Sequence, residues 1–473
     1  MCFPKAAPRK MMRNSPKTSK FSKGSFRDPS GFLFIKNGQL LRRVDINYKD
    51  NFDYFVKSGL YKKLTEEGYL ISHKSVKFPS SYPNTYKIIK PEKIPFISYP
   101  YEWCFSQLKD AALLTLLINR KSIEKGMILK DASAYNVQFL QGKPIFIDTL
   151  SFEKYKEGTP WIAYQQFCRH LLSPLLLAAY KDYRLMQFSR IFIDGIPLDL
   201  TSKLLPLSSI LNFSVLTNIH MHSKAESFLE DKFVKRKESY ISQNSLFAII
   251  NNLENLISKL DLRTKKTEWL DYYEKDSYGN RSLRNKKNIV KGLFKEIGRV
   301  DMLWDLGSNI GYFSKALDVK NTFIVDFDND ILAVEKDYKE VKKRHLTNVL
   351  PLFLDLTNPS SGIGWANEER DSLIQRGPCD VALALALIHH FAITHNLPLS
   401  KIANFFKHIC KWLIIEFVPK GDFQIKRLLL NREDIFSEYN QENFEKEFSN
   451  FFYIRKKIRI YNSERVMYLM KRK

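Results

Sequence analysis

The C-terminal part of the chain alternates between short apolar runs and amphipathic segments of helix length, and no other feature constrains the fold as strongly. Strands that alternate with helices in this way build a parallel sheet with crossover helices. The five strand candidates are residues 302–305, 322–326, 349–355, 381–388 and 412–417. Two more strand-like runs, 452–460 and 465–470, are joined by a short turn and predict a closing antiparallel hairpin. We therefore predict an α/β domain over residues 297–473.

A turn with two glycines follows the first of these strands. Its sequence is Asp305-Leu306-Gly307-Ser308-Asn309-Ile310-Gly311. Glycines allow a tight turn and close approach of a ligand to the backbone, and the start of the next helix offers N–H groups. Asp326 ends the second strand, 21 residues after Asp305, where a carboxylate can accept hydrogen bonds from both hydroxyls of an adenosine ribose. The loop is GxxxG rather than GxGxxG, which argues against a dinucleotide.

These two motifs resemble the first two motifs of class I S-adenosylmethionine-dependent methyltransferases. The resemblance implies a Rossmann-like sheet, S-adenosyl-L-methionine as the cofactor, and transfer of its methyl group to an acceptor. In that family the acid at the Asp305 position holds the methionine end, the acid at the Asp326 position holds the ribose, and Asp355 matches the position close to the adenine. Many members have a third glycine where this chain has Asn309. The cofactor-binding residues implied are Asp305, Gly307, Ser308, Asn309, Gly311, Asp326 and Asp355.

Other segments resemble a bacterial methyltransferase-like group that includes a rhizobial host-specific nodulation protein. In the C-terminal half these segments are residues 358–365, 384–390 and 415–420, and upstream they are 131–136 and 146–153. The resemblance therefore extends over nearly the whole chain beyond its basic N-terminal arm. It implies no particular methyl acceptor.

Two adjacent histidines, His389 and His390, follow the fourth strand at the sheet edge where the acceptor should lie. A histidine there can remove a proton from a hydroxyl or an amine near neutral pH, so both are catalytic candidates. The alternative is that each bonds a loop carbonyl. Glu416, at the end of the fifth strand, is a weaker candidate. Aromatic residues within 269–278 either fold over the cofactor or pack a helix on the core.

The N-terminal half predicts a separate α+β domain over residues 26–222, after a basic disordered arm (1–25) and before a charged helical connector (223–296). The turn Asn37-Gly38 within residues 31–44 predicts a hairpin. Apolar residues at helical spacing predict helices over 103–123 and 161–180.

One pattern in this half supports a competing hypothesis. Asp131, Asn136 five residues later and Asp148 resemble a kinase catalytic loop and its metal-binding aspartate. The HRD histidine, the DFG glycine, a glycine-rich loop and an identifiable phosphate-binding lysine are missing. Two hypotheses stay open: a domain that recognises or shields the methyl acceptor, and a kinase-like domain, active or not, with the C-terminal domain as a binding module.

The composition bears on the partners and the cell compartment of the protein, and it says little about the reaction. The net charge of +24 is compatible with nucleic acid, but the basic residues are spread along the chain, and we favour a solvated basic surface. Five cysteines without a CxxC pair give neither a zinc spacing nor a disulfide framework, so we expect no metal site and a cytoplasmic protein. No apolar run reaches the roughly 20 residues that a membrane span needs.

Overall fold

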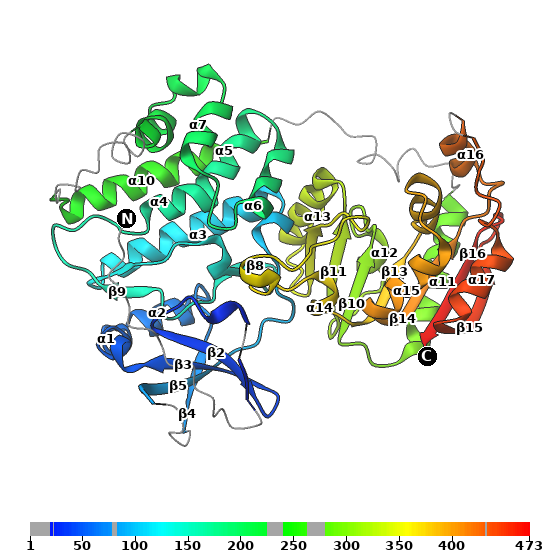
Figure 1. Cartoon of the computed structure of the whole chain (residues 1–473), viewed down its shortest axis with the longest axis horizontal. Helices are drawn as coiled ribbons and strands as arrows, with labels where there is room; N and C mark the ends of the chain where they lie inside the picture. The colour runs from blue at the N-terminus through cyan, green and yellow to red at the C-terminus, as the bar shows by residue number, and fades with distance from the viewer. Residues whose placement is uncertain (1–18, 22, 78–82, 225–239, 263–279, 431–432) are drawn as a thin grey trace.

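The computed structural model describes residues 19–21, 23–77, 83–224, 240–262, 280–430 and 433–473. An antiparallel sheet and a helical layer form the N-terminal half, and a second sheet flanked by helices lies beside them (Figure 1). Most of the basic arm and the aromatic residues at 269–278 fall outside the described residues.

The N-terminal sheet has five strands in the order β1-β2-β3-β5-β4, all antiparallel to their neighbours. The predicted hairpin is confirmed: Asn37 and Gly38 have φ values of 50° and 72°, the left-handed backbone that a two-residue hairpin turn requires. The strands are β1 (Ser19–Phe21), β2 (Gly31–Lys36), β3 (Gln39–Asp45), β4 (His73–Val76) and β5 (Thr85–Pro91), with helices α1 (Lys49–Lys57) and α2 (Leu60–Glu66) between β3 and β4.

The helical layer is built around α3 (Phe105–Ile123), which confirms the helix expected there. The second expected helix also forms, with a π-helical turn at Cys168–Leu172 between α4 (Tyr164–Phe167) and α5 (Ser173–Tyr180). The remaining helices are α6 (Phe188–Ile191), α7 (Leu198–Leu204), α8 (Phe213–Val215) and α10 (Gln243–Lys259). Two small antiparallel pairs lie against this layer: β6 (Met127–Leu129) with β9 (Phe152–Lys154), and β7 (Val137–Leu140) with β8 (Lys143–Phe146).

The C-terminal sheet has seven strands in the order β12-β11-β10-β13-β14-β16-β15. The first five are parallel, and β16 runs antiparallel between β14 and β15. The strands are β10 (Met302–Leu306), β11 (Phe323–Asp328), β12 (Val349–Phe353), β13 (Cys379–Ala384), β14 (Cys410–Phe417), β15 (Phe452–Arg459) and β16 (Val466–Arg472). This is the Rossmann-like arrangement with a terminal antiparallel hairpin that the class I methyltransferase resemblance implies.

Helices cover both faces of this sheet because alternate residues of each strand point to opposite faces. Leu303 belongs to the same buried cluster as residues of α11, whereas its neighbour Trp304 belongs to the cluster that includes residues of α15, and it contacts Phe96 of the N-terminal half. The helices of this half are α11 (Asn280–Ile297), α12 (Tyr312–Ala316), α13 (Ile331–Lys343), α14 (Leu373–Arg376), α15 (Leu399–Ile409), α16 (Phe423–Leu429) and α17 (Gln441–Ser449).

The two halves share one apolar core and a buried ion pair. The Phe96 ring lies 5.7 Å from Trp304 and 5.9 Å from Phe327, centroid to centroid. Beside it, Glu102 pairs with Arg376 at 2.5 Å, and the side chains are 1% and 4% exposed. Ser360 also donates to Glu102. Glu102 of the N-terminal half therefore binds the segment between β12 and β13 through a buried ion pair and a hydrogen bond.

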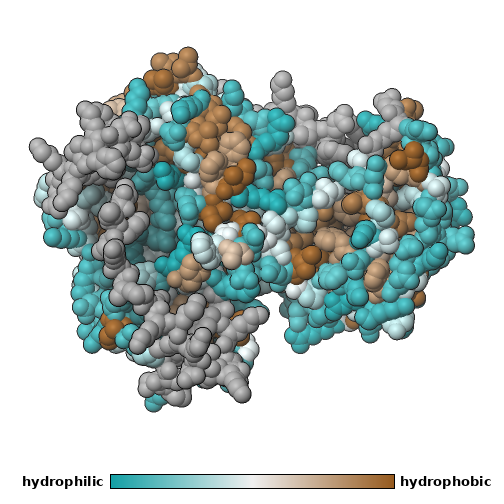
Figure 2. Space-filling model, viewed as in Figure 1, coloured by the Kyte–Doolittle hydropathy of each residue, from teal (hydrophilic) through white to brown (hydrophobic). Residues whose placement is uncertain are grey.

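Most of the visible surface is hydrophilic (Figure 2). Leu207, Leu211 and Phe213 are exceptions, exposed near the end of the helical layer. Within the described ranges, no helix is both long and apolar enough to cross a membrane. Cys104, Cys168, Cys379 and Cys410 are free and buried.

Candidate functional site

A cavity of about 310 Å³ opens at the carboxyl ends of strands β10 to β13. Ligands of open α/β sheets bind at this edge. The cavity is lined by Leu283, Lys286, Asp305, Gly307, Ser308, Asn309, Phe313, Asp328, Asn329, Leu354, Asp355, Leu356, Thr357, Leu385, Ala386, Leu387, His390, Phe391, Thr394 and His395. Five of the seven cofactor residues expected from the sequence are therefore at the cavity, together with one of the two histidines.

The glycine turn after β10 forms the floor of this cavity. Gly307 and Asn309 both have positive φ, 74° and 53°, so the asparagine adopts the left-handed backbone that glycine normally supplies. The N–H groups of Gly307 and Ser308 donate to the Phe327 carbonyl at 2.8 and 3.0 Å. These bonds hold the turn against the end of β11.

Asp328, rather than Asp326, is the acid of β11 that lines the cavity. Asp326 pairs in register with Asp305 inside the sheet, is fully buried, and is not among the residues that line the cavity. Asp328 lies two residues further along and accepts a hydrogen bond from the Asn309 N–H at 2.7 Å. Burial raises the Asp328 pKa to about 6. The sequence offered both acids, and only the length of β11 distinguishes them.

Gly311, also expected at the cofactor, lies beneath the turn and does not line the cavity. It has a φ of 65°, and a Cβ there would collide with the Asp326 carboxylate and approach Lys315 Cε to 2.7 Å. Lys315 in turn pairs with Asp337 at 2.5 Å. Gly311 thus leaves room for a buried group of charged side chains.

That buried group has strongly perturbed acids. Burial is the main cause that raises the pKa values of Asp305, Asp326 and Asp337, and their mutual repulsion adds to it. The Lys315 ammonium opposes the rise at Asp326 and Asp337. The protein therefore holds three carboxyl groups under and beside the turn with few compensating cations.

His390 lines the cavity, whereas His389 lies behind it and is 3% exposed. Their rings are 4.3 Å apart, centroid to centroid. Burial lowers the pKa of His390, with a further contribution from the His395 charge. Burial lowers the pKa of His389 further. Of the two histidines, His390 is therefore the one that reaches the cavity, and its lowered pKa favours the neutral imidazole.

His395 reaches the same cavity because residues His390–Thr394 form a π-helical turn. The His395 N–H donates to the His390 carbonyl at 3.1 Å, a bond between residues five apart. A π-helical turn has no simple sequence signature, and the sequence analysis missed this residue.

Glu416, the weaker catalytic candidate, does not line the cavity. Its fully buried carboxylate pairs with Lys286 at 2.6 Å and with Arg465 at 3.2 Å. Two cations hold it in place, so it is not available as a base at the cavity. Lys286, which the sequence analysis missed, belongs to α11 and does line the cavity.

The three residues of the kinase-like pattern also come together. Asn136 donates to Ser151 at 3.3 Å, and Ser151 donates to Asp148 at 2.6 Å. Burial raises the pKa of Asp131, and the nearby Asp148 charge adds to it. Arg42 of β3 pairs with Asp148 at 2.8 Å and with Asp28 at 2.6 Å. A cation that the sequence analysis missed therefore lies at this second cluster.

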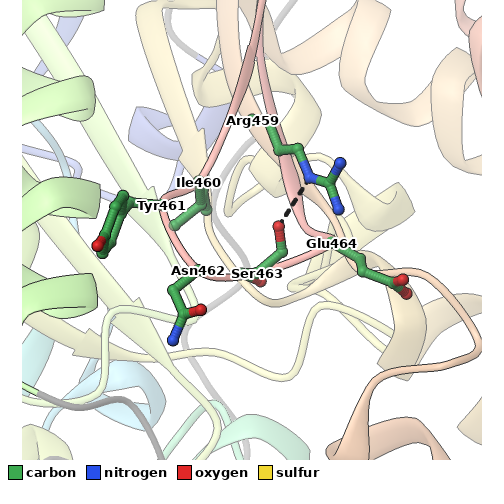
Figure 3. A pocket seen from close by; sticks show the side chains of 6 residues that line it. All are labelled: Arg459, Ile460, Tyr461, Asn462, Ser463 and Glu464. Carbon is green, nitrogen blue, oxygen red and sulfur yellow. Dashed lines mark hydrogen bonds between the residues drawn. The ribbon is translucent and has the colours of Figure 1, made fainter.

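Another hollow lies at the turn between β15 and β16 (Figure 3). It is formed by six consecutive residues, among which Arg459 donates to the Ser463 carbonyl at 3.0 Å. A hollow within one turn gathers no groups from other elements, so it is not a candidate site. Among the residues that the structure describes, no group of three or more His, Cys, Asp or Glu is placed to hold a metal ion.

No protein-family model matches the chain. Over 477 residues it is 32% identical to nodulation protein NoeA of Rhizobium meliloti (strain 1021), and the match covers 98% of each chain.

Similar solved structures match only part of the chain. The N-methyltransferase NodS from Bradyrhizobium japonicum WM9 is 8% identical with a TM-score of 0.30, over 41% of this chain and 97% of its own. Magnesium protoporphyrin IX methyltransferase from Synechocystis PCC 6803, solved with bound SAH, is 14% identical with a TM-score of 0.31, over 43% of this chain and 93% of its own. The bifunctional kinase-methyltransferase WbdD is 18% identical with a TM-score of 0.29, over 46% of this chain and 45% of its own.

Proposed function

The chain belongs to the family of nodulation protein NoeA, and we propose that it is a methyltransferase that uses S-adenosyl-L-methionine. The observation that carries the proposal is the cavity at the carboxyl edge of a Rossmann-like sheet, with Asp305, the turn 307–309, Asp328 and Asp355 along it. These groups follow three neighbouring strands, so they suit a ligand that lies across the edge.

The side chains present fit this cofactor. Asp305 Oδ2 and Ser308 Oγ are buried and have no hydrogen-bond partner among the residues that the structure describes. Buried polar atoms without a partner are costly, and a polar ligand at the cavity would satisfy them. In this proposal Asp305 holds the methionine ammonium, Asp328 replaces Asp326 at the ribose, and Asp355 lies near the adenine.

The cofactor supplies an activated methyl group when bound, so the protein has to align the acceptor and exclude water. His390 is proposed to accept the proton of an acceptor hydroxyl or amine, because its lowered pKa keeps the imidazole neutral near pH 7. His389 lies against the His390 ring and is proposed to hold it in place. The proposed acceptor is a molecule other than a nucleic acid, because the basic residues are spread along the chain rather than gathered in one patch.

We also propose that the methyltransferase unit begins at Asn280 rather than at residue 297, because α11 supplies Lys286 and Leu283 to the cavity. The N-terminal half is proposed to recognise or shield the acceptor. We propose that the protein is located in the cytoplasm.

Calorimetric titration with S-adenosyl-L-methionine tests the function. The Asp328→Asn variant should bind the cofactor at least about tenfold more weakly, because an amide replaces a charged acceptor of two ribose hydrogen bonds. Asp318→Asn is the matched control, since Asp318 lies outside the cavity lining and Asn tolerates its positive φ of 52°. Folded wild-type protein that does not bind the cofactor would refute the proposal.

A second candidate function is phosphotransfer, or nucleotide binding without transfer, in the N-terminal half. The observation that favours it is the cluster of Asp131, Asn136 and Asp148, which the loops around β6 to β9 bring together. Titration with Mg-ATP tests it: binding should be lost in Asp148→Asn and kept in Asp328→Asn. Absence of Mg-ATP binding would leave this cluster a structural role, with Arg42 as the partner of Asp148.

A further inference from the structure

Lys286 is a buried cation at the cavity, and its surroundings explain how it can be there. Its residue is 4% exposed, its ammonium lies 2.6 Å from Glu416, and it lies 4.6 Å from the centroid of the Phe313 ring. An ammonium buried in this way needs a counter-charge, which Glu416 provides. The same group nevertheless lines the cavity.

Glu416, the counter-charge, is part of a row of alternating cations and anions rather than of a single ion pair. Glu416 also pairs with Arg465 at 3.2 Å, and Arg465 pairs with Asp422 at 2.7 Å. One carboxylate is thus shared by two cations, and one guanidinium by two acids. Lys286 is the member of this row of ions that lines the cavity, and an ammonium has three N–H donors, so its pairing with Glu416 is compatible with donation to a ligand.

Asp305 lines the same cavity and carries the opposite charge when it is ionised. The two groups are close enough for the Lys286 charge to oppose the rise of the Asp305 pKa. Asp355, Leu356 and Thr357 line the other end, beyond β11. An ammonium and a carboxyl group that line the same cavity are complementary to an α-amino acid, which carries a carboxylate and an ammonium on one carbon.

We infer that Lys286 binds the carboxylate of the methionine moiety of S-adenosyl-L-methionine, next to the ammonium held by Asp305. The inference rests on the proposed function and names a further cofactor-binding residue, supplied by a helix that precedes the sheet. Glu416 and Arg465 act through Lys286 as positioning residues, because they fix the ammonium without lining the cavity.

The test compares two ligands that differ only in the carboxylate: S-adenosyl-L-methionine and its decarboxylated form. The wild type should bind the first about 10- to 100-fold more tightly than the second, the range expected for a charge-assisted hydrogen bond. Lys286→Met, which keeps the length of the side chain, should bind both ligands with equal affinity. Asp305→Asn should weaken both and keep the preference, since it removes the partner of the ammonium.

The Glu416→Gln variant distinguishes ligand binding by Lys286 from its role in packing. It keeps Lys286 but removes the charge that fixes its ammonium, so the preference for the carboxylate ligand should decrease without disappearing, whereas Lys286→Met should abolish it. If Lys286→Met weakens both ligands by the same factor, Lys286 has only a structural role and the inference is wrong. If the wild type binds neither ligand, the proposed function fails and the inference fails with it.

Discussion

At the scale of single residues, only some of the acidic groups around the glycine turn can contact a ligand in the cavity. Asp305 and Asp328 reach the cavity, whereas Asp326 and Asp337 are enclosed beneath it. The enclosed acids cannot be neutralised by a bound ligand. Their protonation therefore affects the stability of the fold rather than binding.

This enclosure predicts that Asp326 and Asp337 stabilise the folded state less at pH 8 than at pH 6. Burial raises the pKa values of Asp326 and Asp337, so between their ordinary and raised pKa values the folded state binds more protons than the unfolded state. The contribution of these two acids to the free energy of unfolding then falls as the pH rises through that window. Asp326→Asn should reduce the fall by roughly 1 to 3 kcal/mol, measured by urea unfolding at both pH values. An equal fall in the variant and the wild type would contradict the prediction.

A second prediction at this scale concerns His390. Burial and the His395 charge lower its pKa, so its imidazole should titrate below the usual value of about 6.5. His395→Gln should bring the titration closer to that value, because it removes one of the two causes. Histidine-selective NMR across pH measures this, with His390→Gln to assign the signal. A His390 pKa above 7 would rule out the effect.

At the scale of elements, the parallel strands and the hairpin were predictable because their apolar runs are continuous and separated by helix-length segments. The local backbone geometry at the ends of these elements could not be predicted from the sequence. The acid at the cavity is Asp328 because β11 extends to that residue, and strand ends are not marked by a strong pattern here. His395 depends on a π-helical turn, and Lys286 depends on how α11 packs against β14. Both are tertiary effects that spacing along the chain does not reveal.

The start of α12 gives a prediction at the same scale. Gly311→Ala should lower the free energy of unfolding by more than the roughly 1–2 kcal/mol of left-handed backbone strain, because the new methyl group also collides with the Asp326 carboxylate. Gly298→Ala is the matched control: φ there is 83°, and a Cβ would meet nothing within 4 Å. Urea unfolding of both variants measures the difference. Equal losses would show that the enclosed acids move aside freely.

At the scale of the whole molecule, the two halves meet through charges that only their association satisfies. Arg376 pairs with Glu102 and also lies 4.9 Å from the centroid of the Phe96 ring. Tyr338 and Lys342 of α13 both contact Asp110 of α3. Arg190 of α6 donates to the carbonyl groups of Asn358 and Pro359, just beyond the cavity residue Thr357. Residues of the N-terminal half therefore support the end of the cavity that lies beyond β12.

Arg376→Met should lower the free energy of unfolding by about 3–5 kcal/mol, because it leaves the buried Glu102 without its counter-charge. The double variant Glu102→Gln/Arg376→Met should recover part of that loss, since it removes both charges. Urea unfolding followed by tryptophan fluorescence measures both. A loss below about 1 kcal/mol in the single variant would mean that water reaches the pair.

The shared core around Phe96, Trp304 and Phe327 has a consequence for cooperativity. Neither half can melt alone without exposing the aromatic rings and the ion pair that face the other. Heating should therefore produce one calorimetric transition for the described fold rather than two. Each half expressed separately would expose an aggregation-prone apolar surface to water. We therefore expect neither half of this protein to stay in solution without the other.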